Sequence, residues 1–406
     1  MIKSRITNNN KFFNKFFCHY GHNEFYIFIF SLAKTIFMQL AIVINLLFLA
    51  QYVLFRVIKF NMENKMKIKR ILISALVILG FTSFSNVANA SCGSLVIAEQ
   101  NWASAELMAN VDKVILEEGY GCEVELVPGA TMPTFTSMND KGTPDMNPEQ
   151  WANAVYEPLK VAVKEKRIFV ANGAPITGLG EGWWLTPGSI EKHPELKGMT
   201  ALQILERPDL FPDKEDPSKG AFVGCPAGWG CQLANANLFV AYEMEKKGWK
   251  LIDPGSAAGL DGTISKASDS GKPWFGYYWN PTSMVGKYGL IPVDFGIEFA
   301  GRDNWDNCIM KPAGECANPK PTAWTKSEVN SLITKSFKEK AGKGPTKYVE
   351  KRTYPGEVMN GMLVYMADNQ AKGSDAAVEF LVRYPDVWTK WVPADVANKI
   401  KKGIGL

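Results

Sequence analysis

The pattern of apolar and polar positions beyond residue 91 predicts alternating strands and helices. Ser94–Ala98 is a short apolar run typical of a buried strand, and Ala103–Glu118 has apolar residues at helical spacing that end at Gly119. A second strand is expected at Glu123–Val127. The chain therefore opens with a strand–helix–strand unit.

The alternation continues through the middle of the chain. Further strands are expected at 169–171, 221–223, 249–252, 274–278 and 290–294, with helices at 150–166, 232–247 and 265–270. The tail is expected to be helical, at 326–338, 356–369, 376–384 and 394–402. Strands that alternate with helices predict an α/β fold with parallel sheets flanked by helices.

The length of the chain predicts two lobes. The 316 residues after Ala90 exceed the usual size of a single core. Crossovers are expected near 182–187 and 290–295, so one lobe would consist of 91–185 and 296–406, and the other of 186–295. Each lobe would be a sheet flanked by helices, and the cleft between them would suit a small ligand.

The first 90 residues resemble an export signal behind an extra segment. A basic run at 66–70, an apolar run at 71–81 and small residues at 87–90 are typical of a secretory signal peptide, which we place at 66–90. We interpret residues 1–65 as upstream sequence from a start assigned too early. The alternative is a membrane anchor, because Thr35–Phe55 is long and apolar enough to span a bilayer. In either case we expect an exported, periplasmic protein that is soluble after cleavage near Ser91.

Composition and charge exclude several classes of protein. With 46% hydrophobic and 21% charged residues, the chain is neither disordered nor a multi-span membrane protein. Of the 45 Lys/Arg and 41 Asp/Glu, 11 and 2 lie before residue 91, which leaves 34 against 39 and a formal charge of −5. No basic cluster follows, so we do not expect nucleic acid as a partner. Beyond residue 91 the only histidine is His193, which disfavours serine triads and His-rich zinc sites.

Six cysteines follow the signal segment, an even number that fits three disulfides in an exported protein. Spacing favours two local loops, Cys225–Cys231 and Cys308–Cys316, which leaves Cys92 and Cys122 as the third pair. Other pairings, and buried free thiols, remain alternatives at this stage.

Two kinds of motif carry candidate binding chemistry. Gly224–Cys231 is a Gly-rich loop before a helix, where backbone amides could receive a carboxylate or another small oxyanion. It lacks the Gly-Lys-Ser/Thr ending of a nucleotide-binding loop. In addition, four tryptophans follow strands or end them, positions at which open α/β sheets bind ligands; they are Trp102, Trp151, Trp229 and Trp279.

Tryptophans in this arrangement suit a methylated ammonium group. Such a cation cannot donate an N–H hydrogen bond, so several electron-rich rings must hold it, each contributing up to about 2 kcal/mol when water is excluded. Core packing is the alternative for any single Trp. Glu149 lies two residues before Trp151 and could place a carboxylate beside the cation. Its alternative is an ordinary exposed Glu at a helix N-terminus.

On these motifs the chain resembles the periplasmic substrate-binding proteins of ABC importers for glycine betaine, proline betaine and related methylated amines. The resemblance covers most of 92–406 and is most specific at Cys225–Cys231, with support from 273–279, 182–184 and 119–122. It implies a two-lobed fold of type II, a monomer, and delivery of the ligand to an inner-membrane permease. The family boxes the trimethylammonium group with aromatic rings and binds the carboxylate with backbone amides, which implies roles for Trp151, Trp229, Trp279, Gly230 and Cys231.

Two features bear on the ligand. The glycine betaine proteins carry a His four residues after one box Trp, where this chain has Val155. The segments 101–104 and 149–151 are closer to the trimethylamine N-oxide-binding branch, in which four tryptophans and one Glu surround the ligand. Both ligands therefore stay open.

Two other functions remain possible from the sequence. A periplasmic osmolyte sensor needs the same closing cleft, and an exported enzyme could use Glu149 as a general base. The sequence shows no nucleophile–base pair and no cofactor fingerprint, so we expect no enzymatic activity, catalytic residue or cofactor. Acidic loops at 209–216 and 303–307 do not have the spacing of an EF-hand, and we expect no metal site.

Overall fold

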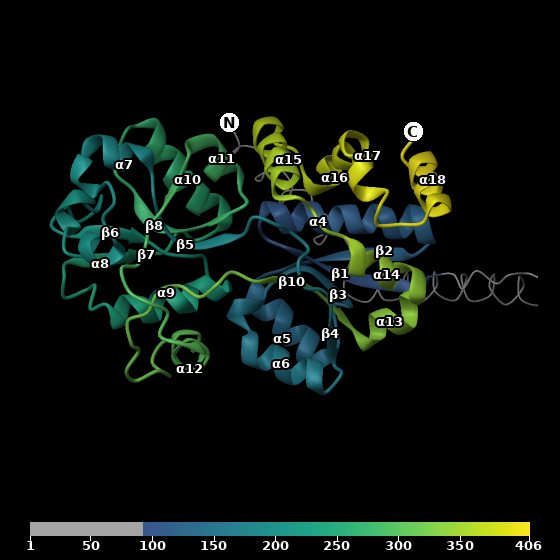
Figure 1. The fold of residues 1–406 in the computed structure, drawn as a ribbon, viewed down its shortest axis with the longest axis horizontal. Coiled ribbons are helices and arrows are strands. Elements are labelled where there is room, and N and C mark those ends of the chain that lie inside the picture. The colour runs from purple at the N-terminus through teal and green to yellow at the C-terminus, as the bar shows by residue number, and fades with distance from the viewer. Residues whose placement is uncertain (1–91) are drawn as a thin grey trace, which may run out of the picture. The chain divides into compact units, whose positions relative to one another are not determined.

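The computed structural model describes residues 92–406, which form two five-stranded sheets flanked by helices (Figure 1). The predicted signal peptide at 66–90 and the segment 1–65 lie outside the described residues. No helix within 92–406 is long and apolar enough to cross a membrane.

The first sheet has the strand order β2-β1-β3-β10-β4. Its strands are β1 (Ser94–Gln100), β2 (Glu123–Gly129), β3 (Met146–Trp151), β4 (Ile168–Asn172) and β10 (Val329–Thr334). β1 runs parallel to β2 and β3, whereas β10 runs antiparallel to both β3 and β4. The strand–helix–strand opening is confirmed: β1 and β2 are joined by α4 (Ala103–Val114), whose last turns widen into a π-helical segment, Ile115–Gly119.

The second sheet has the order β7-β6-β8-β5-β9. Its strands are β5 (Gly180–Leu185), β6 (Gly220–Val223), β7 (Trp249–Ile252), β8 (Phe275–Asn280) and β9 (Ile291–Pro292). β6 runs parallel to β7 and β8, and β5 runs antiparallel to β8 and β9. We call the parts of the chain that carry the two sheets the first and second lobes.

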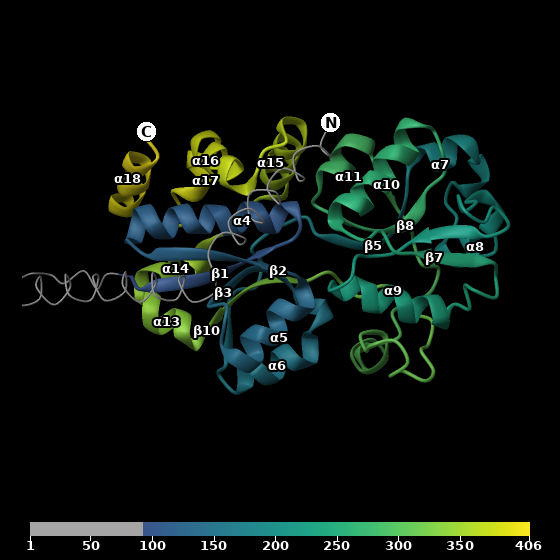
Figure 2. The same ribbon diagram turned by 180° about the vertical axis from the view of Figure 1, so that it is seen from behind.

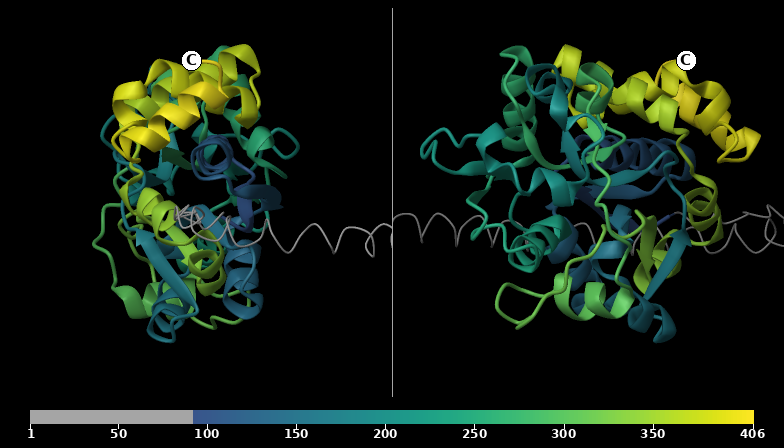
Figure 3. Two further views of the ribbon diagram at one scale, coloured as in Figure 1. Left: turned by 90° about the vertical axis from the view of Figure 1, so that its right-hand side faces the viewer. Right: turned by 60° about the vertical axis from the view of Figure 1, so that its left-hand side comes forward.

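Helices cover both faces of each sheet. Besides α4, the helices are α5 (Thr131–Lys141), α6 (Tyr156–Lys164), α7 (Pro187–Lys192), α8 (Ala201–Ile204), α9 (Gly230–Ala241), α10 (Ala257–Asp269), α11 (Ser283–Tyr288), α12 (Arg302–Asn304), α13 (Lys335–Ala341), α14 (Lys343–Lys351), α15 (Gly356–Asn369), α16 (Gly373–Arg383), α17 (Pro385–Trp388) and α18 (Ala394–Gly403). In the first lobe, α4 packs against α16, and α15 to α18 lie on that side of the sheet, while α5 and α6 lie on the other (Figures 2 and 3).

Three expectations about the elements are wrong. The sheets are mixed rather than parallel, because one strand in each returns antiparallel beside the parallel strands. The helix expected at 326–338 is mostly β10, since Val329–Thr334 fills the gap between β3 and β4. The helix expected from residue 150 begins only at Tyr156, because Glu149, Gln150 and Trp151 extend β3.

The sheets divide the chain a few residues away from the expected lobe limits. β5 precedes residue 186 but pairs with β8, so it belongs to the second sheet. The chain crosses between the sheets in the segments after β4 and after β9. The exact limits of the lobes as folding units stay a prediction.

Three disulfides join Cys92 to Cys122, Cys225 to Cys231 and Cys308 to Cys316. The first connects the start of β1 to the start of β2, which fixes the opening unit at its edge. The second closes the Gly-rich loop before α9. These are the pairs that the spacing favours.

Candidate functional site

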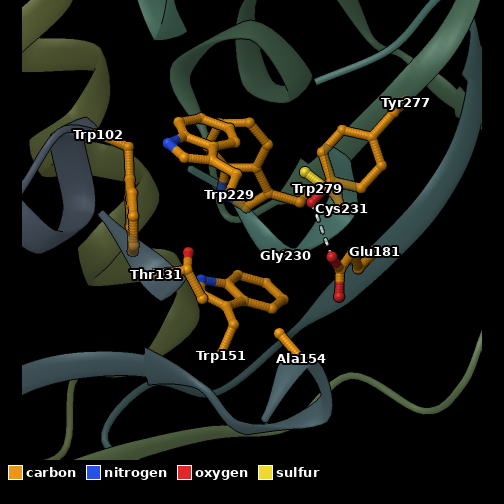
Figure 4. Close-up of a pocket in the computed structure, with 10 residues that line it drawn as sticks. All are labelled: Trp102, Thr131, Trp151, Ala154, Glu181, Trp229, Gly230, Cys231, Tyr277 and Trp279. Atoms are coloured by element: carbon orange, nitrogen blue, oxygen red, sulfur yellow. Dashed lines mark hydrogen bonds between the residues drawn. The ribbon is translucent and has the colours of Figure 1, made fainter. Parts of the chain in front are cut away.

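The site lies where the carboxyl ends of strands from both sheets meet. Parallel strands present the loops at their carboxyl ends on one edge of a sheet, and open α/β sheets bind ligands there. A pocket of about 320 Å³, part of it open to solvent, lies between the lobes. Figure 4 shows the residues that line it, namely Trp102, Thr131, Trp151, Ala154, Glu181, Trp229, Gly230, Cys231, Tyr277 and Trp279.

The structure brings all four predicted tryptophans together in this pocket, two from each lobe. Trp102 precedes α4 and Trp151 ends β3, whereas Trp229 precedes α9 and Trp279 lies in β8. Their exposed fractions are only 4–7%. The centre of the Trp229 ring lies 5.5 Å from the centre of the Trp102 ring and 5.2 Å from that of the Trp279 ring, and its plane is nearly perpendicular to both. We name this group, together with Tyr277, the aromatic cage.

Glu149 lies directly behind the cage. It is 0% exposed. Its Oε1 accepts hydrogen bonds from Trp102 Nε1 at 2.8 Å, Ser104 Oγ at 3.1 Å and Trp151 Nε1 at 3.1 Å. Its Oε2 has no hydrogen-bond partner among the described residues. The carboxyl thus fixes two cage rings, and the alternative of an exposed Glu at a helix N-terminus is wrong because Glu149 lies inside β3.

Burial raises the pKa of Glu149, and the three hydrogen bonds together with the positive charge of Arg352 oppose that rise. Arg352 is itself fully buried and forms an ion pair with Asp112 at 2.8 Å. It also donates to Ser331 Oγ at 2.8 Å and to the Pro148 carbonyl at 3.4 Å, so it anchors the residue before Glu149. Burial raises the pKa of Asp112 to about 6, and the positive charge of Arg352 opposes part of that rise.

The acid that lines the pocket itself, Glu181, is not among the site residues predicted from the sequence. Its Oε1 accepts from Tyr277 OH at 2.8 Å, and its Oε2 accepts from Asn153 Nδ2 at 2.9 Å. Burial raises its pKa, and these hydrogen bonds oppose the rise. Antiparallel pairing of β5 with β8 puts Glu181 directly opposite Trp279. The only sequence signal is an acid between two glycines ahead of Trp183, which without the pairing says nothing about the site.

The Gly-rich loop approaches the first lobe closely. Gly228 has φ +86°, in the region that favours glycine, and a Cβ on Gly230 would overlap the side chain of Ala154. Gly230 and Cys231 form the first turn of α9, where backbone amides have no partner within the helix. This turn faces the pocket and offers donors to a negatively charged ligand group.

The ionisable groups at the pocket are acids, without a basic partner in the described lining. Its ten described lining residues include an acid, Glu181, and no base, and a second acid, Glu149, lies behind two of the rings. Across residues 92–406, no group of three or more His, Cys, Asp or Glu side chains could hold a metal ion. The pocket is therefore suited to a small ligand with a positive, apolar surface.

Two lobes that enclose a pocket at their strand ends define a two-lobed substrate-binding protein of the periplasmic type. The model of one family, the substrate-binding domain of ABC-type glycine betaine transport systems, matches residues 93–383, and the chain belongs to this family. The family consists of transport binding proteins, as the sequence resemblance implies.

Solved structures show the same fold. An ABC-transporter choline-binding protein in complex with choline has a TM-score of 0.60 and 15% identity, over 78% of this chain and 99% of its own. The glycine betaine/L-proline-binding protein ProX from Borrelia burgdorferi has a TM-score of 0.58 and 16% identity, over 76% and 99%. Lactococcal OpuAC in its closed form with glycine betaine has a TM-score of 0.53 and 17% identity, over 74% and 100%. A search of curated proteins found no match.

Proposed function

We propose that this protein captures a small methylated ammonium compound in the aromatic cage and delivers it to the membrane permease of an ABC importer. The family supports the transport role. The observation that carries the ligand class is the convergence of four buried tryptophans, two from each lobe, on one pocket. The six cysteines after residue 91 are all paired, which supports an exported protein in an oxidising compartment such as the periplasm.

Cation–π attraction explains why the cage would select this class. A trimethylammonium group spreads its positive charge over methyl surfaces, which contact aromatic faces without losing hydrogen bonds. Desolvation in the closed cleft strengthens this attraction, because water no longer screens the charge. In their deprotonated forms, Glu149 and Glu181 add negative charge to this attraction from opposite lobes.

Two ligands fit this proposal. The amides at the start of α9 would receive the carboxylate of glycine betaine, and the same donors would receive the single oxygen of trimethylamine N-oxide. The two carboxyls near the cage disfavour a bulky anionic end, which favours the N-oxide. A carboxyl whose pKa is raised can also hold a proton and donate it in a hydrogen bond to the ligand oxygen.

Calorimetric titration tests the proposal with glycine betaine and trimethylamine N-oxide side by side. We expect tight binding of at least one, and a loss of at least tenfold in Trp229→Ala and in Trp279→Ala. Trp249→Phe serves as a matched control, since Trp249 is buried in the second lobe away from the pocket. Failure of folded protein to bind either compound, or unchanged affinity in both cage variants, would reject the cage function.

A further inference from the structure

The strand order of the two sheets places both crossovers on one side of the cleft. The chain crosses from β4 to β5 and from β9 to β10, and these four strands lie together at one end of each sheet. The opposite ends consist of β1 and β2 in the first lobe and β6 and β7 in the second. Rotation about the crossovers therefore separates the β1–β2 end from the β6–β7 end most widely. We call this side the mouth of the cleft.

Two hydrogen bonds join the lobes across the mouth. Trp229 Nε1, which precedes α9 in the second lobe, donates to Asn101 Oδ1 at the end of β1, at 2.7 Å. The backbone amide of Met132, in the first turn of α5, donates to the Gly228 carbonyl at 3.1 Å. In each bond the donor and the acceptor belong to opposite lobes, so neither bond can persist when the cleft opens.

Trp229 takes part in both the cage and the mouth. Its ring face contributes to the cage, while its ring N–H points to Asn101, which is exposed and does not line the pocket. A ligand that orders the Trp229 ring also orders the donor of the interlobe bond. The disulfide between Cys225 and Cys231 closes the loop that carries Gly228 and Trp229, so both bonds originate from one constrained segment.

We infer that Asn101 is a positioning residue that closes the lobes over the bound ligand through Trp229, an inference that rests on the proposed function. Asn101 does not line the pocket. It acts on the closed state, and its removal therefore speeds ligand release while leaving the encounter of ligand with the open cleft unchanged. Loss of a residue that only supports the fold would not raise the release rate while leaving the association rate unchanged.

Stopped-flow tryptophan fluorescence with trimethylamine N-oxide and with glycine betaine measures both rates. Loss of one interlobe hydrogen bond predicts a release rate about three- to tenfold higher in Asn101→Ala, with the association rate within about twofold of wild type. Asn101→Asp keeps the acceptor and restores the release rate. Asn369→Ala, an exposed asparagine whose amide bonds only within α15, is the matched control.

A double-mutant cycle separates this role from others. Trp229→Phe keeps a ring in the cage but removes the N–H, so adding Asn101→Ala to it is expected to change the release rate no further. Two results would overturn the inference. One is a release rate in Asn101→Ala equal to that of the wild type. The other is an increase in release rate that is as large when Asn101→Ala is added to Trp229→Phe as when it is added to the wild type.

Small-angle scattering of the ligand-free protein keeps the test independent of ligand identity. We expect Asn101→Ala to have a larger radius of gyration than wild type, because fewer molecules are closed. If neither compound binds but the variant is more open, the ligand proposal fails and the inference about Asn101 stands. If neither compound binds and the variant and the wild type give identical scattering curves, both the ligand proposal and the inference about Asn101 are rejected.

Discussion

At the scale of single residues, Glu149 shows how a buried acid can organise aromatic rings. One of its oxygens accepts three hydrogen bonds, two of them from cage indoles, and the other oxygen accepts none from the described residues. The three donors fix the edges of two rings, which leaves the ring faces free for a ligand. A carboxyl in this position contributes both geometry and charge.

We predict that Glu149→Gln weakens choline binding at least tenfold. Choline is a suitable probe because its charge does not change with pH. Burial raises the pKa of Glu149, so the carboxyl gains a proton as the pH falls towards that raised value, and cation binding is lost. Wild-type affinity should therefore increase with rising pH, and the dependence should be smaller in the variant. Titrations across the acidic to neutral pH range measure this.

The exposed Glu125→Gln in β2 is the control for that experiment. Glu181 has a raised pKa as well, so part of the pH dependence is expected to remain in Glu149→Gln and to disappear when Glu181→Gln is added. Choline affinity that does not respond to pH in the wild type would contradict the role of both carboxyls.

At the scale of elements, the loop that leads into α9 combines a disulfide, a glycine with positive φ and a cage tryptophan. The bridge limits the conformations of this segment in the open as well as the closed protein. The loop therefore presents Trp229 and the first amides of α9 in one geometry before the ligand arrives, which lowers the entropy lost on binding.

Replacing Cys225 and Cys231 together by serine is predicted to weaken ligand binding five- to twentyfold and to lower the free energy of unfolding by about 2 kcal/mol. The matched control replaces Cys308 and Cys316, which close a loop of similar length outside the pocket lining. We expect a comparable loss of stability from the control and no loss of affinity. Equal affinity losses in the two double variants, measured by calorimetry and chemical denaturation, would show that the loop has no special role.

At the scale of the whole described molecule, binding and closure are one equilibrium. The two lobes each contribute two tryptophans, so neither lobe alone holds a complete cage. A ligand that contacts both halves binds the closed state more tightly than the open state and shifts the population towards it. Only two crossovers, after β4 and after β9, connect the sheets, which permits this motion.

A saturating ligand is therefore predicted to shrink and to stabilise the protein. At a concentration about a hundred times its dissociation constant, it should add about 2.7 kcal/mol to the free energy of unfolding. Scanning calorimetry should show a higher Tm, and scattering should show a smaller radius of gyration. A ligand that raises Tm without changing the radius would contradict closure, although not binding.

Much of this protein can be predicted from local sequence patterns. The strand–helix–strand opening, the helices at 356–369 and 394–402 and the favoured disulfide pairs agree with the structure. The four tryptophans do converge on one pocket, because residues at the carboxyl ends of parallel strands share one edge of a sheet. Periodicity, turn residues and cysteine spacing depend on near neighbours in the chain, so they can be read without a structure.

The tertiary structure alone decided the rest. The segment of β10 was expected to be helical. It forms a strand because it pairs on both sides, with β3 and β4, which lie much earlier in the chain. Glu181 enters the site only because β5 returns antiparallel to β8, and Asn101 meets Trp229 only because the lobes face each other. The sequence by itself determined which chemical groups the site contains. Their partners depended on pairings between distant segments, whose free energy comes from packing and hydrogen bonds that no local pattern encodes.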